Sequence, residues 1–443
     1  MTPPNDLDAE RAVLSACFAD VNSYEQAAGT ILPESFFWHP HRVIWEAIGA
    51  VVAANEEPDV VTVAGWLREH GKIKAANGIR YIGEIIDAVP SVSNVPAYIK
   101  TVSNLYKLRK LIEATHKIAA QGYSVASCDV EEYADQSQAI VWDIVSSGMA
   151  RDRLTNVKDQ TAETFKHIRA IAENDRDALG AANTGFKGLD RLLCGWFPGD
   201  LSILAARPAM GKTGLALQLA MFQAKAGACS LLFSLEMSTL QLMSRLLAQD
   251  ARVDLNRMRR GDVQEMDWRK ITGGAARLEE VGEGMWIDDT SGSTVLDISA
   301  KSRRVQAMAK KKGRDLKLIV VDYLQLLRPA DKEGTREQQV AAMSRSLKRI
   351  ARDLGVTVLA LSQLSRAVES RQDKRPVLSD LRESGAIEQD ADNVMFLYRP
   401  GYYEKDNENR EADLILAKQR NGPTGDVCLE FFSGCASFED RSF

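Results

Sequence analysis

Residues 201–220 read LSILAARPAMGKTGLALQLA, and this stretch indicates how the larger part of the chain folds. The apolar run 201–206 is typical of a buried strand, and an amphipathic helix follows the loop 206–213. A strand, a glycine-containing loop and a helix, in this order, form a phosphate-binding loop. Backbone N–H groups of the loop and the N-terminus of the helix then hold phosphate oxygens. The stretch therefore predicts an α/β nucleotide-binding domain.

The side chains of the loop predict which groups touch the nucleotide. Lys212 is expected to reach the β- and γ-phosphates, and the hydroxyl of Thr213 is expected to bind Mg²⁺. The first glycine of the usual G-x-x-x-x-G-K-[ST] pattern is Ala206 here, a departure at the tightest turn. The strand–loop–helix context still predicts binding of a nucleoside triphosphate. The predicted nucleotide-binding residues are Ala209, Met210, Gly211, Lys212 and Thr213.

Three polar residues at the ends of other apolar runs are candidates for the hydrolysis chemistry. Asp322 ends the run LKLIVVD and is predicted to hold the metal together with Thr213. Glu236 follows the run SLLFSL and is a candidate for orienting the attacking water. Gln363 ends the run VTVLALSQ and is a candidate sensor of the γ-phosphate. The carboxyl ends of parallel strands form the edge where α/β folds bind ligands. The alternative for each residue is a cap on its strand.

Apolar runs of strand length recur throughout the C-terminal part of the chain. Helix-period stretches separate the earlier runs, which predicts a largely parallel sheet covered by helices on both faces. The last runs have no helical stretch between them, and hairpins are expected there. The runs are 201–206, 229–235, 316–324, 356–364, 393–399, 412–420 and 426–432.

Two charged stretches are candidates for contact with nucleic acid. Residues 301–317 carry eight basic side chains and one acidic one, and a solvated helix face is favoured there over DNA contact. The polar loop 379–392 places Arg382 close to Gly385, where the small residue lets the backbone approach a ligand. This second loop is therefore the nucleic-acid candidate, although acidic residues outnumber basic ones around it.

A pair of cations near the end of the run 412–420 is a candidate phosphate contact. Lys418 and Arg420 are two residues apart, so in a strand their side chains point to the same side. An arginine so placed can act as a finger on a phosphoryl group.

Composition and charge divide the chain into three parts. Residues 1–150 read as mostly helical, residues 151–183 as a linker that carries one amphipathic helix, and residues 184–443 hold the α/β pattern. The first part has 11 basic and 19 acidic side chains, against 45 and 42 in residues 151–443. The total of 56 − 61 = −5 argues against a generally basic nucleic-acid binder. The net charge is −8 for residues 1–150 and +3 for residues 151–443, and these opposite signs suggest two separate functions.

Cysteine usage and the N-terminal sequence predict a cytoplasmic protein without a membrane partner. The six cysteines are scattered, and none has the spacing of a zinc site or of a disulfide framework. The N-terminus lacks the basic and apolar regions of a signal peptide, and no apolar run reaches 18 residues.

Several of these motifs together resemble the DnaB-type replicative DNA helicases. ARPAMGKT, SLEMS, VVDYLQLL, LSQLSR, SDLRESGAIEQDAD and KQRNGPTG occur in this order. The entry segment TGFKGLDRLLCGWFPGDL, the stretch IDDTSG and the N-terminal DAERAVL and PHR are also similar to that family. The resemblance therefore covers nearly the whole chain.

The resemblance implies a homohexameric ring with a RecA-like core and ATP sites at the subunit interfaces. It further implies translocation on single-stranded DNA, 5′ to 3′, and unwinding of the replication fork, with ATP and Mg²⁺ as cofactors. Residues 1–150 would form a helical collar that binds a primase and a helicase loader. The linker helix around Phe165 and Ile168 would pack on the adjacent subunit.

The resemblance also implies a role for each candidate residue. Lys212 and Thr213 bind phosphates and Mg²⁺, and Asp322 holds the metal through its shell. Glu236 polarises the attacking water, and Gln363 couples the γ-phosphate to the DNA loop. Lys418 and Arg420 would reach the nucleotide of a neighbouring subunit. The residues that would contact the DNA backbone are Arg382, Glu383 and Gly385.

Two other functions share parts of this pattern. A RecA-type recombinase or a clock-type ATPase has the same loop, catalytic glutamate and fold, but the acidic helical part and the KQRNG stretch favour the helicase. A non-catalytic scaffold that binds a primase or a loader through residues 1–150 is the third interpretation. The presence of Lys212, Glu236 and Asp322 argues against an inactive ATPase.

Overall fold

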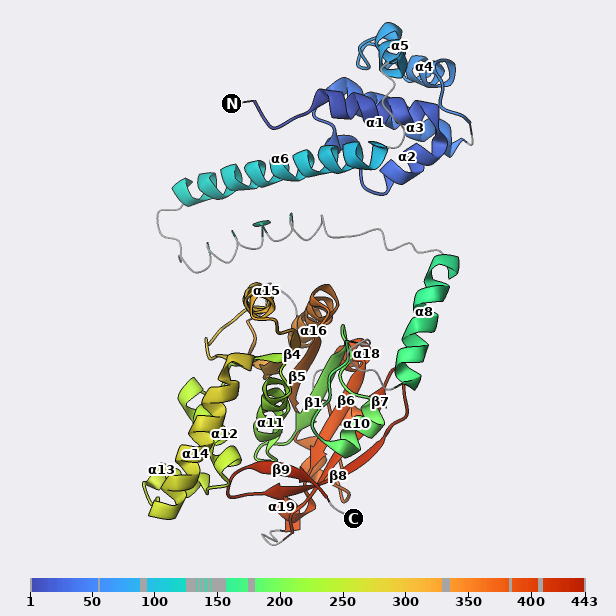
Figure 1. The fold of residues 1–443 in the computed structure, drawn as a ribbon. Coiled ribbons are helices and arrows are strands. Elements are labelled where there is room, and N and C mark those ends of the chain that lie inside the picture. The colour runs from blue at the N-terminus through green and yellow to red at the C-terminus, as the bar shows by residue number, and fades with distance from the viewer. Residues whose placement is uncertain are drawn as a thin grey trace. The chain divides into compact units, whose positions relative to one another are not determined.

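The computed structural model of this 443-residue chain consists of two compact units, Met1–Val157 and Lys158–Phe443. It describes residues 2–54, 56–87, 94–124, 157–173, 180–328, 335–381, 385–404 and 409–441, and residues 133, 137, 140, 141 and 144. The predicted boundary between residues 150 and 151 lies outside the described residues. Within these ranges, each helix is too short or too polar to cross a membrane. Figure 1 shows the elements of both units.

In its described residues the first unit is helical, as predicted. Its helices are α1 (Leu7–Ala19), α2 (Val21–Ala28), α3 (His39–Ala53), α4 (Val60–Glu69), α5 (Ile79–Asp87) and α6 (Val95–Ser124). Short polar side chains begin several of them: Asp6 accepts a hydrogen bond from the N–H of Ala9, and Asp59 accepts from Thr62. The apolar stripes of these helices meet in one core that includes Leu14, Ile44 and Ile82.

The second unit is built on one nine-stranded sheet with the order β3-β2-β4-β5-β1-β6-β7-β8-β9. The six strands from β3 to β6 in this order are parallel to one another, and β7, β8 and β9 continue the sheet antiparallel. The predicted parallel sheet with terminal hairpins is therefore confirmed. The strands are β1 (Leu201–Ala206), β2 (Cys229–Ser234), β3 (Met285–Asp288), β4 (Leu316–Asp322), β5 (Thr357–Gln363), β6 (Asn393–Tyr398), β7 (Glu411–Gln419), β8 (Gly425–Phe432) and β9 (Ser437–Asp440).

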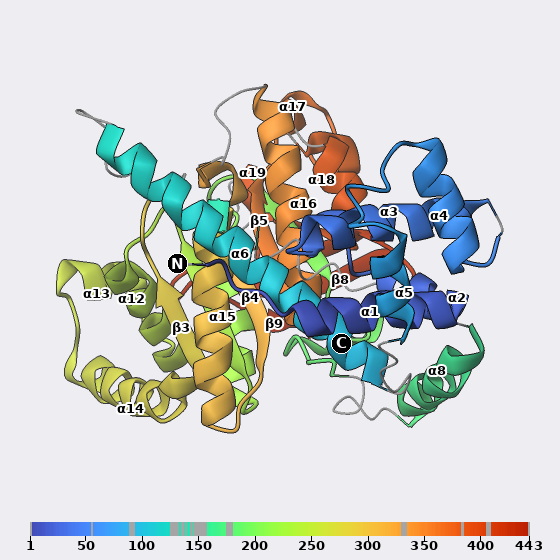
Figure 2. The same ribbon diagram turned by 90° about the horizontal axis from the view of Figure 1, so that it is seen from above.

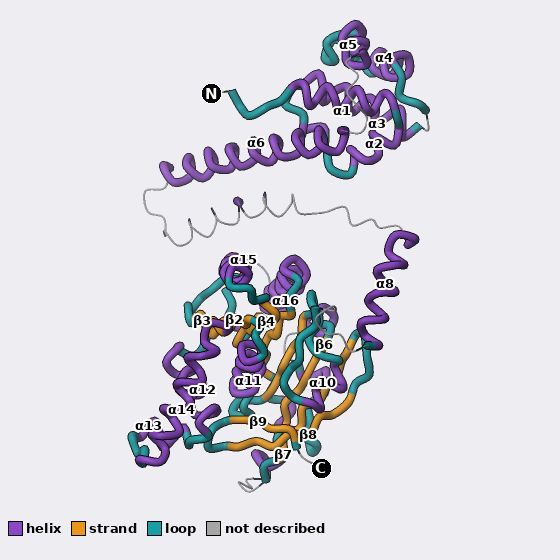
Figure 3. Tube along the Cα trace, in the orientation of Figure 1, coloured by secondary structure: helices purple, strands orange, loops and turns teal. Residues whose placement is uncertain are grey.

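Helices cover both faces of this sheet, which confirms the predicted α/β RecA-like class (Figure 3). All six residues of β1 are buried: Ile203 and Ala205 belong to one core, and Leu204 and Ala206 to the other. One face packs against α10 (Lys187–Leu193), α11 (Lys212–Lys225) and α12 (Thr239–Ala251). The opposite face packs against α15 (Val295–Lys311) and α16 (Arg336–Leu354).

The remaining helices of the second unit lie at its margins. Helices α13 (Leu255–Arg260) and α14 (Glu265–Val281) lie beside α12 (Figure 2) and share a small core around Ile271. Short helices α17 (Ala367–Ser370), α18 (Gly385–Asp390) and α19 (Pro400–Glu404) connect the last strands. Helix α8 (Val157–Ala172) is the predicted linker helix, and Phe165 and Ile168 on it are 69% and 57% exposed.

Strand register places the predicted motifs at two opposite edges of the sheet. Ala206 pairs with Gln363 and Ser234 pairs with Asp322, so the carboxyl ends of β1, β2, β4 and β5 lie together. Because β7 is antiparallel, its carboxyl end lies at the other edge, where β1 and β6 begin. Strand β1 has six residues and rises about 3.3 Å per residue, so the two edges are about 20 Å apart.

Candidate functional site

The phosphate-binding loop joins the carboxyl end of β1 to the N-terminus of α11. Ala209 and Gly211 have positive φ angles of 65° and 98°, which turn the chain sharply before α11. At Gly211 a side chain does not fit, because an added Cβ would lie 2.8 Å from Cζ of Phe438. The first N–H groups of α11 have no partner within the helix and face the loop. The backbone therefore offers the concave, positively polarised surface that a phosphate needs.

Lys212, Thr213 and Asp322 form the polar centre of this edge. The hydroxyl of Thr213 donates a 2.7 Å hydrogen bond to Oδ2 of Asp322, and Nζ of Lys212 donates to the carbonyl of Ser362 at 3.2 Å. Burial lowers the pKa of Lys212, and the carboxylates of Asp322 and Glu236 partly offset this effect. Oδ1 of Asp322 is buried and has no hydrogen-bond partner among the described residues. A buried, unpaired carboxylate oxygen beside a hydroxyl fits a hard divalent cation such as Mg²⁺ or its water shell.

Glu236 lies two residues beyond the end of β2, exposed and without a hydrogen-bond partner in the described part of the chain. Arg245 of α12 lies near it. Burial lowers the pKa of Arg245, and the charges of Asp322 and Glu236 raise it. Sequence reasoning missed Arg245, since one arginine in an amphipathic helix carries no motif. The signal that was available is its position nine residues after Glu236 on the first helix beyond that strand.

Gln363 ends β5 beside the start of the phosphate-binding loop, as its pairing with Ala206 requires. It lines a cavity of about 380 Å³ together with Tyr323, Gln325 and three arginines, Arg207, Arg336 and Arg366. Arg207 is held inside the protein by Glu369, 2.8 Å away, and by the carbonyl of Leu364. Gln363 therefore lies between the phosphate-binding loop and the chain that follows β4 and β5.

Arg399 is a second residue of this edge that sequence reasoning missed. It follows β6, and its Nη1 donates a 3.2 Å hydrogen bond to the carbonyl of Ala209 in the phosphate-binding loop. Its guanidinium lies 3.7 Å from the ring centroid of Phe431, which packs on Phe438. Because β6 is the direct neighbour of β1, only the strand order reveals this contact, which spans 190 residues of sequence.

Lys418 and Arg420 lie at the opposite edge of the sheet. Nζ of Lys418 donates to the carbonyls of Glu388 and Ala391, at 2.5 Å and 2.8 Å. Nη1 of Arg420 lies 3.1 Å from Oδ1 of Asp392, which directly precedes β6. The two predicted cations therefore lie near each other but about 20 Å from the phosphate-binding loop of their own chain.

The predicted DNA-contact residues are described only in part. Arg382 and Glu383 lie outside the described residues, and Gly385 is the first residue of α18. The backbone of Gly385 is thus connected through one short helix to the carbonyls that Lys418 contacts.

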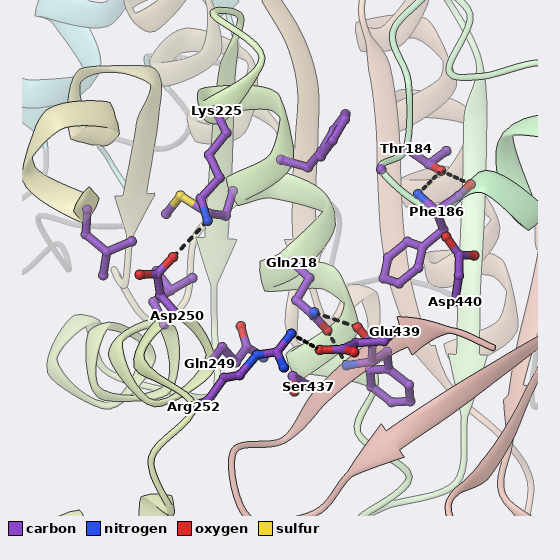
Figure 4. Close-up of a pocket in the computed structure, with 16 residues that line it drawn as sticks. Thr184, Phe186, Gln218, Lys225, Gln249, Asp250, Arg252, Ser437, Glu439 and Asp440 are labelled. Atoms are coloured by element: carbon purple, nitrogen blue, oxygen red, sulfur yellow. Dashed lines mark hydrogen bonds and ion pairs between the residues drawn. The ribbon is translucent and has the colours of Figure 1, made fainter. Parts of the chain in front are cut away.

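A second cavity, of about 480 Å³, lies between α11, α12, α14 and β9 (Figure 4). Its walls include the apolar side chains Phe186, Phe222, Leu246 and Leu278. Charged pairs at its rim are Lys225 with Asp250, 2.8 Å apart, and Arg252 with Glu439. None of the sequence-predicted site residues lines it, so it is separate from the nucleotide edge.

Comparison with known proteins assigns both units. The family model described as "DnaB-like helicase C terminal domain" matches residues 181–440, and "DnaB-like helicase N terminal domain" matches residues 2–104. The replicative DNA helicase DnaB of Geobacillus stearothermophilus is 41% identical over 97% of this chain and 93% of its own length. The replicative DNA helicase DnaC of Bacillus subtilis is 39% identical over the same shares.

Solved structures give the same assignment. A DnaB-like replicative helicase, solved in a study of its interactions with primase, has a TM-score of 0.70 and 30% identity, covering 99% of this chain and 100% of its own. The ATPase domain of G40P has a TM-score of 0.57 and 38% identity, covering 62% of this chain and 98% of its own.

Proposed function

Because this chain belongs to the family of DnaB-like replicative DNA helicases and is an ATP-dependent DNA helicase, we propose that it works as a ring of six copies. In this proposal each ATP lies between two subunits, and its hydrolysis moves the ring along one DNA strand while the other strand is excluded. The ring acts at the replication fork in the bacterial cytoplasm, in line with the similarity of this chain to the replicative helicase of Bacillus subtilis.

The separation of the two predicted halves of the ATP site is the observation that carries the proposal. Lys212 lies at one edge of the sheet, and Lys418 and Arg420 lie at the other, about 20 Å away. A side chain cannot cross the sheet, so Arg420 has no route to its own phosphate-binding loop. A second copy, packed head to tail, brings its Arg420 edge to the first copy's nucleotide edge. Repeating this heterologous contact with a rotation closes a ring.

The residues of the nucleotide edge divide the work of hydrolysis. A bound Mg²⁺ would supply positive charge to offset the negative charge that develops on the phosphate oxygens. Thr213 would hold it directly, and Asp322 would hold its water shell with the unpaired Oδ1. Lys212 binds the β- and γ-phosphates, and exposed Glu236 polarises the attacking water. Lys418 and Arg420 of the neighbour stabilise the charge of the transition state.

Hydrolysis is coupled to DNA through the parts of the chain that follow the strands. Gln363 lines the cavity between the phosphate-binding loop and the segment after β5, and in this proposal it senses the γ-phosphate. Arg382, Glu383 and Gly385 contact the DNA backbone, in part through main-chain groups. Such contacts carry no sequence information, which suits a motor that must pass over every sequence.

Ring closure and partner binding fall to the remaining parts. Phe165 and Ile168 leave an apolar stripe on α8 exposed, and the cavity beside Leu246 and Leu278 offers apolar side chains in its walls. We assign this stripe to the neighbouring subunit's cavity. The helical first unit serves as a platform for a primase and a helicase loader, in line with the primase studied with the similar solved helicase.

Unwinding of forked DNA with one tail blocked at a time tests this function. The expected result is ATP-dependent strand separation that stops when the 5′ tail is blocked and continues when the 3′ tail is blocked. Lys212→Ala serves as the control without hydrolysis. Filament formation without unwinding would instead support a recombinase. Binding of primase without ATPase activity would support a scaffold.

A further inference from the structure

Asp392 is a buried carboxylate that holds three other parts of the second unit. It lies between α18 and β6, and its side chain is only 5% exposed. Oδ2 accepts a 2.8 Å hydrogen bond from the N–H of Leu201 at the start of β1 and also contacts Nζ of Lys348. Oδ1 lies 3.1 Å from Nη1 of Arg420, and the carbonyl of Asp392 accepts from the N–H of Arg420 at 2.8 Å. Asp392 thus fixes both the backbone and the guanidinium of Arg420.

The stretch 388–392, which ends at Asp392, also fixes Lys418. Its ammonium group donates to the carbonyls of Glu388 and Ala391, which lie at the carboxyl end of α18. A cation at this end of a helix is favourable because the free carbonyls carry partial negative charge. Both cations are therefore anchored to one stretch of chain, and this stretch continues from Gly385 at the start of α18.

The contact with Arg420 is not needed to neutralise Asp392. Lys348 already supplies a positive charge, and Leu201 supplies a backbone donor. Arg420 adds a further ion pair and keeps about half of its side chain exposed. A guanidinium has five N–H donors in a rigid plane, so one bond to Oδ1 sets its direction and leaves donors for a phosphate.

We propose that Asp392 is a positioning residue that holds Arg420, beside Lys418, in the orientation required to reach the neighbouring subunit's nucleotide. The inference rests on the proposed action of Arg420 across the subunit interface. Without Asp392 the long side chain of Arg420 samples several rotamers, and the neighbour's hydrolysis slows because its finger is ordered only part of the time. The stretch 379–392 then joins a DNA-contact loop at one end to the positioning carboxylate at the other.

Mixed rings test the proposal. Subunits with Asp392→Asn keep an intact phosphate-binding loop and lack a well-ordered finger, while subunits with Lys212→Ala have the reverse defect. We expect rings of Asp392→Asn alone to lose about 10- to 100-fold in kcat with little change in KM for ATP. In a one-to-one mixture about one interface in four joins an intact loop to an intact finger, so activity rises above that of either variant alone. The matched control is Asp200→Asn, which removes a neighbouring carboxylate and should keep wild-type activity.

A parallel mixture of Arg420→Ala with Lys212→Ala separates the inference from the function it rests on. If this mixture gains no activity, the action of Arg420 on a neighbour is wrong. If it gains activity and the Asp392→Asn mixture does not, the positioning role of Asp392 is wrong. Asp392→Glu, which keeps the charge and moves it by one methylene, replaces Asp392→Asn if that variant forms no rings. In the Arg420→Ala background either change at Asp392 should lower kcat no further, and a clear additional loss would overturn the proposal.

Discussion

Replacing Arg420 by alanine should slow ATP hydrolysis at the neighbouring subunit's nucleotide and leave the stability of the altered chain nearly unchanged. The ion pair that is lost joins a 48% exposed side chain to Asp392 at 3.1 Å, and such pairs contribute about 0–1 kcal/mol to stability. Asp392 keeps Lys348 and the N–H of Leu201 as partners, so no buried charge is left unpaired. The variant should therefore fold and assemble like the wild type.

The catalytic loss is expected to be much larger. Arginine fingers supplied by a neighbour contribute about 10³- to 10⁵-fold to kcat, which equals about 4–7 kcal/mol of transition-state stabilisation. Three quantities are measured on one preparation. Steady-state ATPase assays give the turnover, sedimentation gives the assembly of the rings, and binding of a fluorescent ATP analogue gives the nucleotide affinity. We expect lost turnover, intact rings and nearly unchanged nucleotide affinity. An Arg420→Ala protein that hydrolyses ATP at the wild-type rate would refute the two-subunit site.

Three further changes test other parts of the account. Gly211→Ala places a Cβ 2.8 Å from Phe438 at a φ of +98°, so binding of a fluorescent ATP analogue should weaken at least about tenfold. Gly227→Ala, also at positive φ but with open space around it, should bind the analogue normally. Burial and the charge of Asp392 raise the pKa of Asp200 to about 6, so the ionised form is disfavoured in the fold and its stability cost appears as pH rises from 4 to 7. At pH 8, the free energy of unfolding of Asp200→Asn should therefore exceed that of the wild type by about 1 kcal/mol after allowance for partial exposure. At pH 4, where the carboxyl of Asp200 is already neutral in the fold, the two proteins should be equally stable. A larger gain at pH 4 than at pH 8, measured by thermal unfolding, would contradict this. Phe165→Ser should shift sedimentation from rings to smaller species, whereas Leu240→Ser, at a 77% exposed site on α12, should leave the rings intact.

Sequence patterns predicted the edge of the sheet that holds the phosphate-binding loop. The apolar runs that end in Asp322 and Gln363 became β4 and β5, and the carboxyl ends of both strands lie there. The prediction succeeded because parallel strands run in the same direction. Their carboxyl ends therefore lie at the same edge of the sheet, whatever the order of the strands. The roles of these residues in hydrolysis stay predictions.

Contacts that depend on strand order were not predictable from the sequence. Arg399 reaches Ala209 only because β6 lies beside β1, and Asp392 reaches Leu201 for the same reason. Periodicity identifies strands but not their neighbours. Arg245 was hidden for a different reason, since its helix packs by its apolar residues and the arginine is placed by that packing. The placement of Lys418 and Arg420 at the far edge followed only from the antiparallel direction of β7.

The central claim is that hydrolysis at the nucleotide edge drives strand separation. The most direct measurement follows ATP hydrolysis and fork unwinding in one reaction, with wild-type protein and with Glu236→Gln. This substitution keeps the size of the side chain and removes the carboxylate that polarises water. The account predicts that Glu236→Gln still binds ATP and forked DNA but neither hydrolyses nor unwinds. Unwinding by Glu236→Gln at the wild-type rate would contradict it.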